Sequence, residues 1–206
     1  MLRRLLIPAL ALTALFALAL ALVHAQPPDP RLDADFGGCA ACWQGVQAGV
    51  TLRPQASALL SAAMGVPPIQ PPCFSLSDAA CGTLLWISPR DSANRTQIQF
   101  DQDTAQTIFN QSPGFTVGDA LVTLDRLHQQ LYDVAAGFQR STLFLQVTFA
   151  RASLTLSATV LCPADYTALL WTPVDLVVVQ PPASSGSLAP TSLAFLRRAF
   201  ARLCQN

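Results

Sequence analysis

The sequence predicts an α+β fold made of two tandem units, each combining a helix with antiparallel sheet, followed by a C-terminal helix. The pattern Gly-apolar-Thr-apolar occurs twice, at 49–52 and 114–117, and each copy begins a helical pattern. Strand-like segments follow each helix. The clearest are 142–149 and 154–160, where apolar and polar residues alternate on both sides of a short turn, as in an antiparallel hairpin.

These features divide the chain into five segments. They are a signal peptide (1–25), a linker (26–38), a first α+β unit (39–112), a second α+β unit (113–182), and a linker with a C-terminal helix (183–206).

The N-terminal segment is typical of a secretory signal. Arg3 and Arg4 precede an apolar run from Leu5 to Val23, which ends in Val23-His24-Ala25. Gln26 and the prolines after it favour cleavage behind Ala25. The alternative is an uncleaved membrane anchor, because a run of about 19 residues is just long enough to span a bilayer. Both interpretations place the remainder outside the cytoplasm, so we expect a secreted or cell-envelope protein.

The composition excludes several classes of chemistry. Every acidic residue is Asp and every basic residue is Arg, with 12 of each and a formal net charge of zero. A neutral chain without a basic cluster has no electrostatic footprint for nucleic acid. The absence of Lys excludes a Walker-type phosphate loop and Schiff-base chemistry, and the absence of Glu excludes the His-Glu-x-x-His zinc motif. We expect no cofactor and no metal.

The first unit is expected to open with a helix capped by Thr51. Pro54 lies in its first turn, and Gly65 and Pro67 end it. Its predicted apolar face consists of Leu52, Ala56, Leu59, Leu60 and Ala63. Three strands are predicted after it, at 83–88, 96–100 and 106–109.

The second unit is expected to open with a helix capped by Thr116, with Asp119 at the acidic position of a capping box. Its predicted apolar stripe consists of Val117, Ala120, Leu121, Leu124, Leu127 and Leu131. After the hairpin, 174–179 is predicted to be a strand buried on both faces. A Pro/Ser/Gly linker (181–190) precedes the last helix, whose predicted apolar face consists of Leu193, Leu196, Ala199, Phe200 and Leu203.

The six cysteines all follow the signal, which places them where disulfides persist. Cys204 ends the last helix and Cys162 ends the predicted hairpin, so we predict a disulfide between them. The remaining four would then pair among themselves: Cys39, Cys42, Cys73 and Cys81. A zinc site of these four is disfavoured by the wide spacing of the second pair. A redox role for Cys39-x-x-Cys42 is disfavoured because Trp43 follows the second cysteine, unlike in thioredoxins.

The segment 42–51, Cys-Trp-Gln-Gly-Val-Gln-Ala-Gly-Val-Thr, resembles the Cys-Trp-x-Gly-Ile-x-Pro-Gly-x-Thr opening of uncharacterised secreted bacterial proteins. In these, a stretch similar to 115–121 follows. Both copies of the helix-plus-sheet pattern also look distantly similar to BamE-like envelope lipoproteins and to the tandem fold of β-lactamase-inhibitor proteins. This chain departs from the pattern at Ala48, where proline is usual. The resemblance implies no catalytic or ligand-binding residue.

Several other groups have the chemistry of catalytic, modified or lipid-binding residues. His128 with Asp125 could belong to a hydrolytic set, but His128 falls on the apolar stripe of its helix and no Gly-x-Ser-x-Gly elbow exists. Asn94-Arg95-Thr96 is a formal glycosylation sequon that requires a eukaryotic secretory route. Three arginines near the C-terminus could contact anionic lipid, although such charges more often form a solvated face: Arg197, Arg198 and Arg202.

From the resemblance and the scarcity of catalytic groups, we expect a non-enzymatic module that binds a protein or cell-envelope component through its sheet. Contact with a membrane is expected only if the N-terminal segment is kept as an anchor. One alternative is an Asp-dependent extracytoplasmic hydrolase, with Asp101 and Asp103, or Asp119 and Asp125, as the acid pair. Another is a purely structural surface protein.

Overall fold

The computed structural model describes residues 32, 35–36, 42–71, 82–126, 131–139, 141–149, 153–162, 164, 166–181 and 193–204. The chain divides into two compact units, Met1–Pro30 and Arg31–Asn206, and the first, which contains the whole predicted signal, lies outside these residues. The elements of the second unit are β1 (Cys42–Trp43), β2 (Val46–Gln47), α3 (Arg53–Met64), β3 (Thr83–Ile87), β4 (Arg95–Asp101), β5 (Thr104–Gln111), α4 (Val117–Arg126), β6 (Leu131–Gln139), β7 (Thr142–Phe149), β8 (Leu154–Leu161), α5 (Tyr166–Trp171), β9 (Leu176–Val179) and α6 (Leu193–Cys204).

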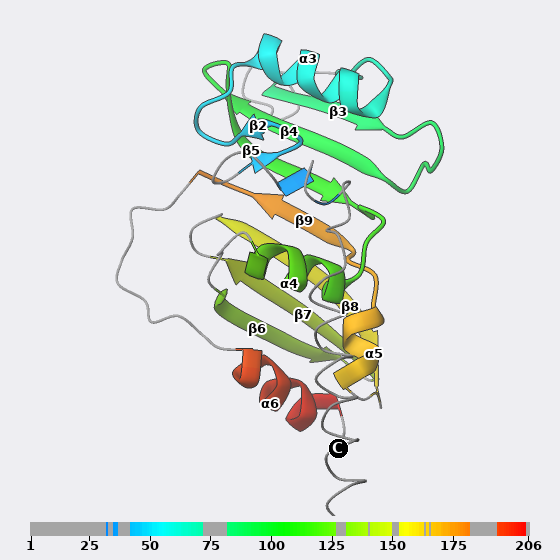
Figure 1. The fold of residues 1–206 in the computed structure, drawn as a ribbon. Helices are drawn as coiled ribbons and strands as arrows, with labels where there is room; N and C mark the ends of the chain where they lie inside the picture. Colours follow the sequence, from blue (N-terminus) through cyan, green and yellow to red (C-terminus); the bar gives the residue numbers. More distant parts are fainter. Residues whose placement is uncertain are drawn as a thin grey trace, which may run out of the picture. The chain divides into compact units, whose positions relative to one another are not determined.

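One seven-stranded antiparallel sheet organises the second unit, in the order β3-β4-β5-β9-β8-β7-β6 (Figure 1). The last strand in sequence, β9, lies in the middle, where it pairs with β5 on one side and β8 on the other. The prediction of an α+β fold with two tandem helix-plus-sheet units is therefore wrong. The protein is mostly β, with small helices, a two-stranded sheet of β1 and β2, and a seven-stranded sheet that β9 makes continuous.

The hydrophobic core lies on one face of this sheet. Along β7 and β8 every second residue is buried, as the two-residue period of a strand requires: Leu143, Leu145, Val147, Phe149, Leu154, Leu156, Ala158 and Val160. Buried residues of α3, α4 and α6 belong to the same core cluster, so these helices cover that face. Helix α3 contacts β3 and β5 directly.

Helix α3 differs from the prediction at its start. Its N-cap is Leu52, which makes no side-chain cap, while the Thr51 hydroxyl accepts a hydrogen bond from the backbone N–H of Gln47 (2.8 Å). The end is as predicted: Gly65 adopts a left-handed conformation (φ 70°), and its N–H donates to the carbonyl of Ser61. Ala56 and Leu60 are buried, but Leu52 and Leu59 are exposed, so the apolar face is narrower than predicted.

Helix α4 begins with the predicted capping box. The N–H of Asp119 donates to Thr116 Oγ1 (3.2 Å), and the N–H and hydroxyl of Thr116 both donate to Asp119 Oδ2 (3.0 and 2.7 Å). Four predicted stripe residues are buried: Val117, Ala120, Leu121 and Leu124. The prediction that the stripe reaches Leu131 is wrong, because Leu131 begins β6, an edge strand that the periodicity did not indicate. Leu127 lies outside the described residues.

The strands of the first half and the long hairpin are present as predicted, with ends shifted by one or two residues. For 174–179, burial on both faces is wrong. Val177 and Val179 are buried, whereas Leu176 and Val178 are only partly so, because no described helix packs on that side of the sheet.

Residues 42–47, at the start of the segment that carries the resemblance, form a β-hairpin. Trp43 and Val46 pair in a small hairpin whose turn, Gln44-Gly45, has positive φ at both positions, as type I′ turns require. Trp43 is buried and packs against the rings of Phe36 and Phe115. The motif Cys-Trp-x-Gly therefore has a structural role: Trp43 packs in the aromatic cluster, and Gly45 occupies a turn position with positive φ.

Residues 49–52 then run along β5. The N–H of Gly49 donates to the carbonyl of Ala105 (2.6 Å), and the N–H of Ala105 donates to the carbonyl of Thr51 (2.9 Å). Residues 49–52 thus pair with the start of β5, which β9 does not reach because it pairs only with residues 108–111. The backbone groups of both ends of β5 are thereby paired.

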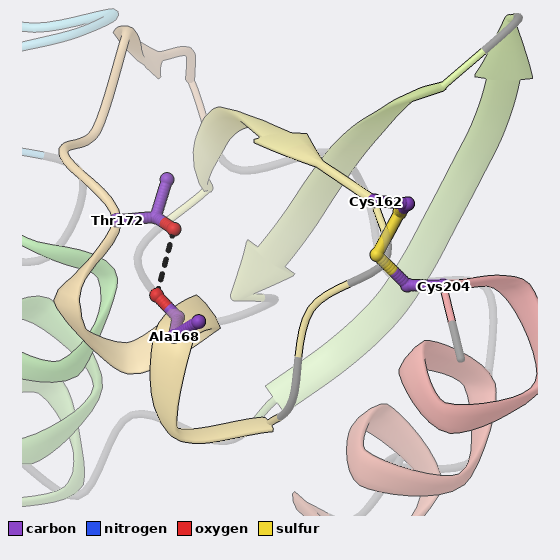
Figure 2. Close-up of a disulfide and its surroundings, with 4 residues drawn as sticks. All are labelled: Cys162, Ala168, Thr172 and Cys204. Atoms are coloured by element: carbon purple, nitrogen blue, oxygen red, sulfur yellow. Dashed lines mark hydrogen bonds between the residues drawn. A yellow bond between two sulfur atoms is a disulfide. The ribbon is translucent and has the colours of Figure 1, made fainter.

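The predicted disulfide between Cys162 and Cys204 is present, with a Cα–Cα distance of 5.1 Å. It joins the end of β8 to the last residue of α6 (Figure 2). Figure 2 also shows Thr172, the residue that follows α5 in the sequence. Its hydroxyl donates a hydrogen bond to the carbonyl of Ala168 (2.9 Å), which satisfies a carbonyl at the end of the helix. Among the described residues, none of the helices has the length and apolar character needed to cross a membrane.

Candidate binding face

The face of the sheet opposite the core is here called the uncovered face. It consists of the residues that alternate with the core residues along each strand, and among the described residues no helix packs on it. One of its residues, Thr83 on β3, is buried (3% exposed). The partly or fully exposed members of this face are Leu85, Ile87, Arg95, Gln97, Gln99, Thr107, Phe109, Gln111, Leu176, Val178, Thr155, Ser157, Thr159, Leu161, Thr142, Phe144, Gln146, Thr148, Ala135, Gly137 and Gln139.

Apart from Arg95, the side chains of this face are apolar or uncharged polar. The apolar ones form two groups, one around Phe109 and Val178 at the centre and one where Phe144 and Leu161 are diagonal neighbours on β7 and β8. Phe144 and Leu161 are 47% and 74% exposed, which is unusual for large apolar residues of a sheet. Threonine, serine and glutamine fill the space between the groups.

A depression of about 150 Å³ lies on the uncovered face over β3, β4 and β5. It is lined by Leu85, Arg95, Gln97, Phe109 and Gln111. The strand register explains why these residues meet: Leu85, Gln97 and Phe109 are directly opposite one another across three strands, and Arg95 is opposite Gln111. The lining thus combines a phenyl ring and an aliphatic chain with two amides and a guanidinium.

Arg95 is held in one orientation by its own loop. Its Nε donates to the carbonyl of Ser92 (2.9 Å), which leaves the two terminal nitrogens of the guanidinium available. Within the described part of the chain, Arg95 has no carboxylate partner, and the amides of Gln97 and Gln111 have no hydrogen-bond partner. The depression therefore presents several donors that the described chain does not use.

Two of the four aspartates that could serve a hydrolase, Asp103 and Asp119, have structural partners. Asp101 ends β4, and Asp103 is the second residue of the two-residue turn that leads to β5, with a positive φ of 63°. The carboxylate of Asp103 forms an ion pair with Arg53 Nε (2.8 Å), and the Arg53 guanidinium also lies over the ring of Phe100, 4.7 Å from its centroid. Asp119 belongs to the capping box. His128 and the side chain of Asp125 lie outside the described residues.

The cysteines not in the Cys162–Cys204 bond are only partly described. Cys42 is disulfide-bonded, and its partner must be one of Cys39, Cys73 and Cys81, which lie outside the described residues. Where the structure is described, no group of three or more His, Cys, Asp or Glu side chains is arranged to hold a metal ion.

The remaining candidates lie elsewhere in the fold. Thr96 of the sequon is completely buried, and its hydroxyl accepts a hydrogen bond from Asn110 Nδ2 (2.7 Å), which also donates to Asn94 (3.3 Å). The side chains of Asn94 and Thr96 thus belong to a polar network with Asn110. Arg197, Arg198 and Arg202 are exposed on α6.

Comparison of the chain with protein-family models, with curated proteins and with solved structures gives no match. The resemblance carried by residues 42–51 therefore stays a prediction.

The depression was missed by sequence reasoning. The alternation of Gln97 and Gln99 with Ile98 correctly predicted a strand with one solvated side. Leu85 and Phe109 belong to the same surface only because β3, β4 and β5 pair in one particular register, and no local pattern encodes that register.

Proposed function

We propose that this protein is a non-enzymatic extracytoplasmic module that binds another protein through the uncovered face. The observation that carries the proposal is the composition of this face, where large apolar side chains are exposed among uncharged polar ones. Protein interfaces have this mixture, with few charges at the centre. Ordinary solvated sheet faces instead carry mainly polar residues.

The dimensions of the sheet support a protein partner. Seven strands at about 4.8 Å spacing are about 30 Å wide; five of them have seven to nine residues and are about 25 Å long, while β3 has five residues and β9 four. The resulting area, roughly 700 Å², is close to the ~800 Å² that each partner contributes to a standard protein–protein interface.

The size of the depression supports the same conclusion. At about 150 Å³ it is smaller than the ~300–1,000 Å³ of pockets that enclose a small-molecule ligand. It matches a side chain or chain end presented by a larger partner. The neutral net charge of the chain is consistent with a partner that is not nucleic acid.

The proposed compartment is the cell envelope or the outside of the cell. The Cys162–Cys204 disulfide is compatible with an oxidising compartment. The predicted signal at residues 1–25 would direct the chain to the export machinery. Cleavage after Ala25 would then release a secreted protein.

Photo-crosslinking in the producing cells tests the proposal. The full chain is made with p-benzoylphenylalanine at position 144, on the uncovered face, and separately at position 122. Val122 is the matched control, because it is also about half exposed (52%) but lies on α4, on the core side of the sheet. We expect one discrete protein adduct from position 144 and none of the same mass from position 122.

The adduct is then identified by mass spectrometry and the partner purified for binding measurements. Phe144→Arg should weaken its binding at least tenfold, and Val122→Arg should change it less than twofold. An adduct from position 122 alone, an adduct of two copies of this chain, or equal binding by Phe144→Arg would overturn the proposal.

A further inference from the structure

The depression on the uncovered face contains an exposed cation with unused hydrogen-bonding capacity. The guanidinium of Arg95 is oriented by the bond from its Nε to the carbonyl of Ser92, so its two terminal nitrogens form a fork with no carboxylate partner among the described residues. An arginine on a partner-binding surface is normally matched by an acceptor, because an unmatched guanidinium would be desolvated when the partner docks.

We infer that this depression is a recognition subsite for a carboxylate on a peptide, with the guanidinium of Arg95 as its bidentate donor. The inference rests on the proposed function, since it names the chemical group that a partner places in the depression. The amides of Gln97 and Gln111 donate to the same carboxylate or to the peptide bond next to it. The ring of Phe109 and the side chain of Leu85 contact the aliphatic part of the residue that carries it.

A carboxylate fits this donor set better than a phosphate. A planar carboxylate presents two oxygens that match the guanidinium fork, and its single negative charge is neutralised by one arginine. A phosphate monoester carries nearly two charges and is typically held by a cluster of cations. Among the described residues, Arg95 is the only cation that lines the depression.

The volume indicates how much of the peptide enters. About 150 Å³ admits one side chain, or a terminal residue with its carboxylate, but not a longer segment. The same chemistry can come from a chain terminus or from an internal acidic side chain, and the test below uses both.

The probe is a set of short peptides titrated into the ¹⁵N-labelled, oxidised full chain and followed by NMR. Acetyl-Ala-Leu-Ala carries a free C-terminal carboxylate, and its C-terminal amide is the matched control. Acetyl-Ala-Leu-Asp-Leu-Ala-amide carries an internal carboxylate, and the same peptide with Asn is its control. We expect saturable shifts of the side-chain amide signals of Gln97 and Gln111 and of Arg95 Nε–H. The dissociation constant should be in the millimolar range for at least one acid, and about tenfold weaker for its uncharged control.

Two arginine variants separate this subsite from general charge attraction. Arg95→Gln should weaken binding of the acid peptide about tenfold, whereas Arg90→Gln, an exposed arginine in the β3–β4 loop, should leave it within twofold. Arg95→Lys should recover only part of the loss, since an ammonium lacks the planar fork. Equal binding of acid and uncharged peptides, an unaffected Arg95→Gln variant, or tighter binding of inorganic phosphate than of the acid peptides would overturn the inference.

The inference and the proposed function fail in distinguishable ways. If the peptides do not shift these signals while Phe144→Arg still abolishes partner binding, the subsite is wrong and the binding face stands. If the acid peptides bind through Arg95 while Phe144→Arg leaves the partner's binding unchanged, the subsite stands and the proposed function is wrong.

Discussion

The indole Nε1 of Trp86 on β3 donates a hydrogen bond to the hydroxyl of Ser61 on α3, at 3.2 Å. Trp86 is completely buried, so this bond satisfies the single polar atom of a large core side chain and links the helix to the sheet.

Ser61→Ala should therefore lower the free energy of unfolding by about 1–2 kcal/mol, because it leaves the buried indole N–H without a partner. Urea denaturation measures the loss. Ser92→Ala, at an exposed serine of the β3–β4 loop, is the control and should change stability by less than about 0.5 kcal/mol. In a Trp86→Phe background the Ser61→Ala effect should largely vanish; an undiminished effect would mean that the bond does not contribute.

Thr116→Ala should destabilise the protein by about 1 kcal/mol, because the N–H of Asp119 loses its acceptor at the start of α4. Thr116→Ser keeps the hydroxyl and should retain most of the stability. Thermal unfolding of the two variants, with amide exchange of residues 117–119, is the measurement. Equal losses in both variants would point to the threonine methyl group instead of the cap.

Gly118→Ala should destabilise the protein by about 1–3 kcal/mol, although alanine is the better helix former by about 1 kcal/mol. A Cβ at this position would lie 2.8 Å from the carbonyl oxygen of Leu170, so α4 and α5 would have to separate. Gly137→Ala on β6 is the control, since a Cβ there meets nothing within 4 Å. It should be neutral or slightly stabilising in the same denaturation series.

Replacing both Cys162 and Cys204 with serine should lower stability by about 4 kcal/mol under oxidising conditions, because the bond closes a loop of 42 residues. Guanidinium denaturation gives the difference. In a reducing buffer, the variant and the wild-type protein should unfold at the same denaturant concentration. Non-reducing peptide mapping should also find Cys42 linked to Cys39, Cys73 or Cys81, and a bond from any of these to Cys204 would contradict the pairing.

Secreted protein should begin at Gln26, because small residues precede this position and prolines follow it. Edman sequencing or intact-mass measurement of protein from the medium tests this. Protein that retains Met1 or its near neighbours and sediments with membranes would support the anchor instead.

The sequence predicted features that depend on neighbouring residues and failed on those that depend on distant ones. The Thr116–Asp119 capping box and the end of α3 at Gly65 are set by contacts within a few residues, and both predictions are confirmed. Thr51 also fits an N-cap pattern, yet its hydroxyl bonds the Gln47 N–H, because residues 49–52 are held against β5. The position of β9 depends on pairing partners more than 60 residues away on one side, so helix and strand periodicity predicted the strand but not its neighbours.

The uncovered face also combines local features that the sequence predicted with long-range features that it did not. The solvated side of β4 was predictable from its alternating glutamines. That Leu85, Arg95 and Phe109 line one depression was not predictable. Cys162–Cys204 was predictable in spite of its long separation, because both cysteines end elements whose limits the sequence marks.

The central place of β9 has a consequence for how the chain is made. A polypeptide is synthesised from its N-terminus, so β3–β5 and β6–β8 are made before residues 176–179 are. Until then β5 and β8 each have one row of backbone N–H and C=O groups without their final partner, and such rows invite pairing with other chains. The sheet is completed only when the last fifth of the chain arrives, and Cys204 emerges later still to fasten α6 to β8. Any product that stops before residue 176 therefore lacks the strand that pairs with both β5 and β8.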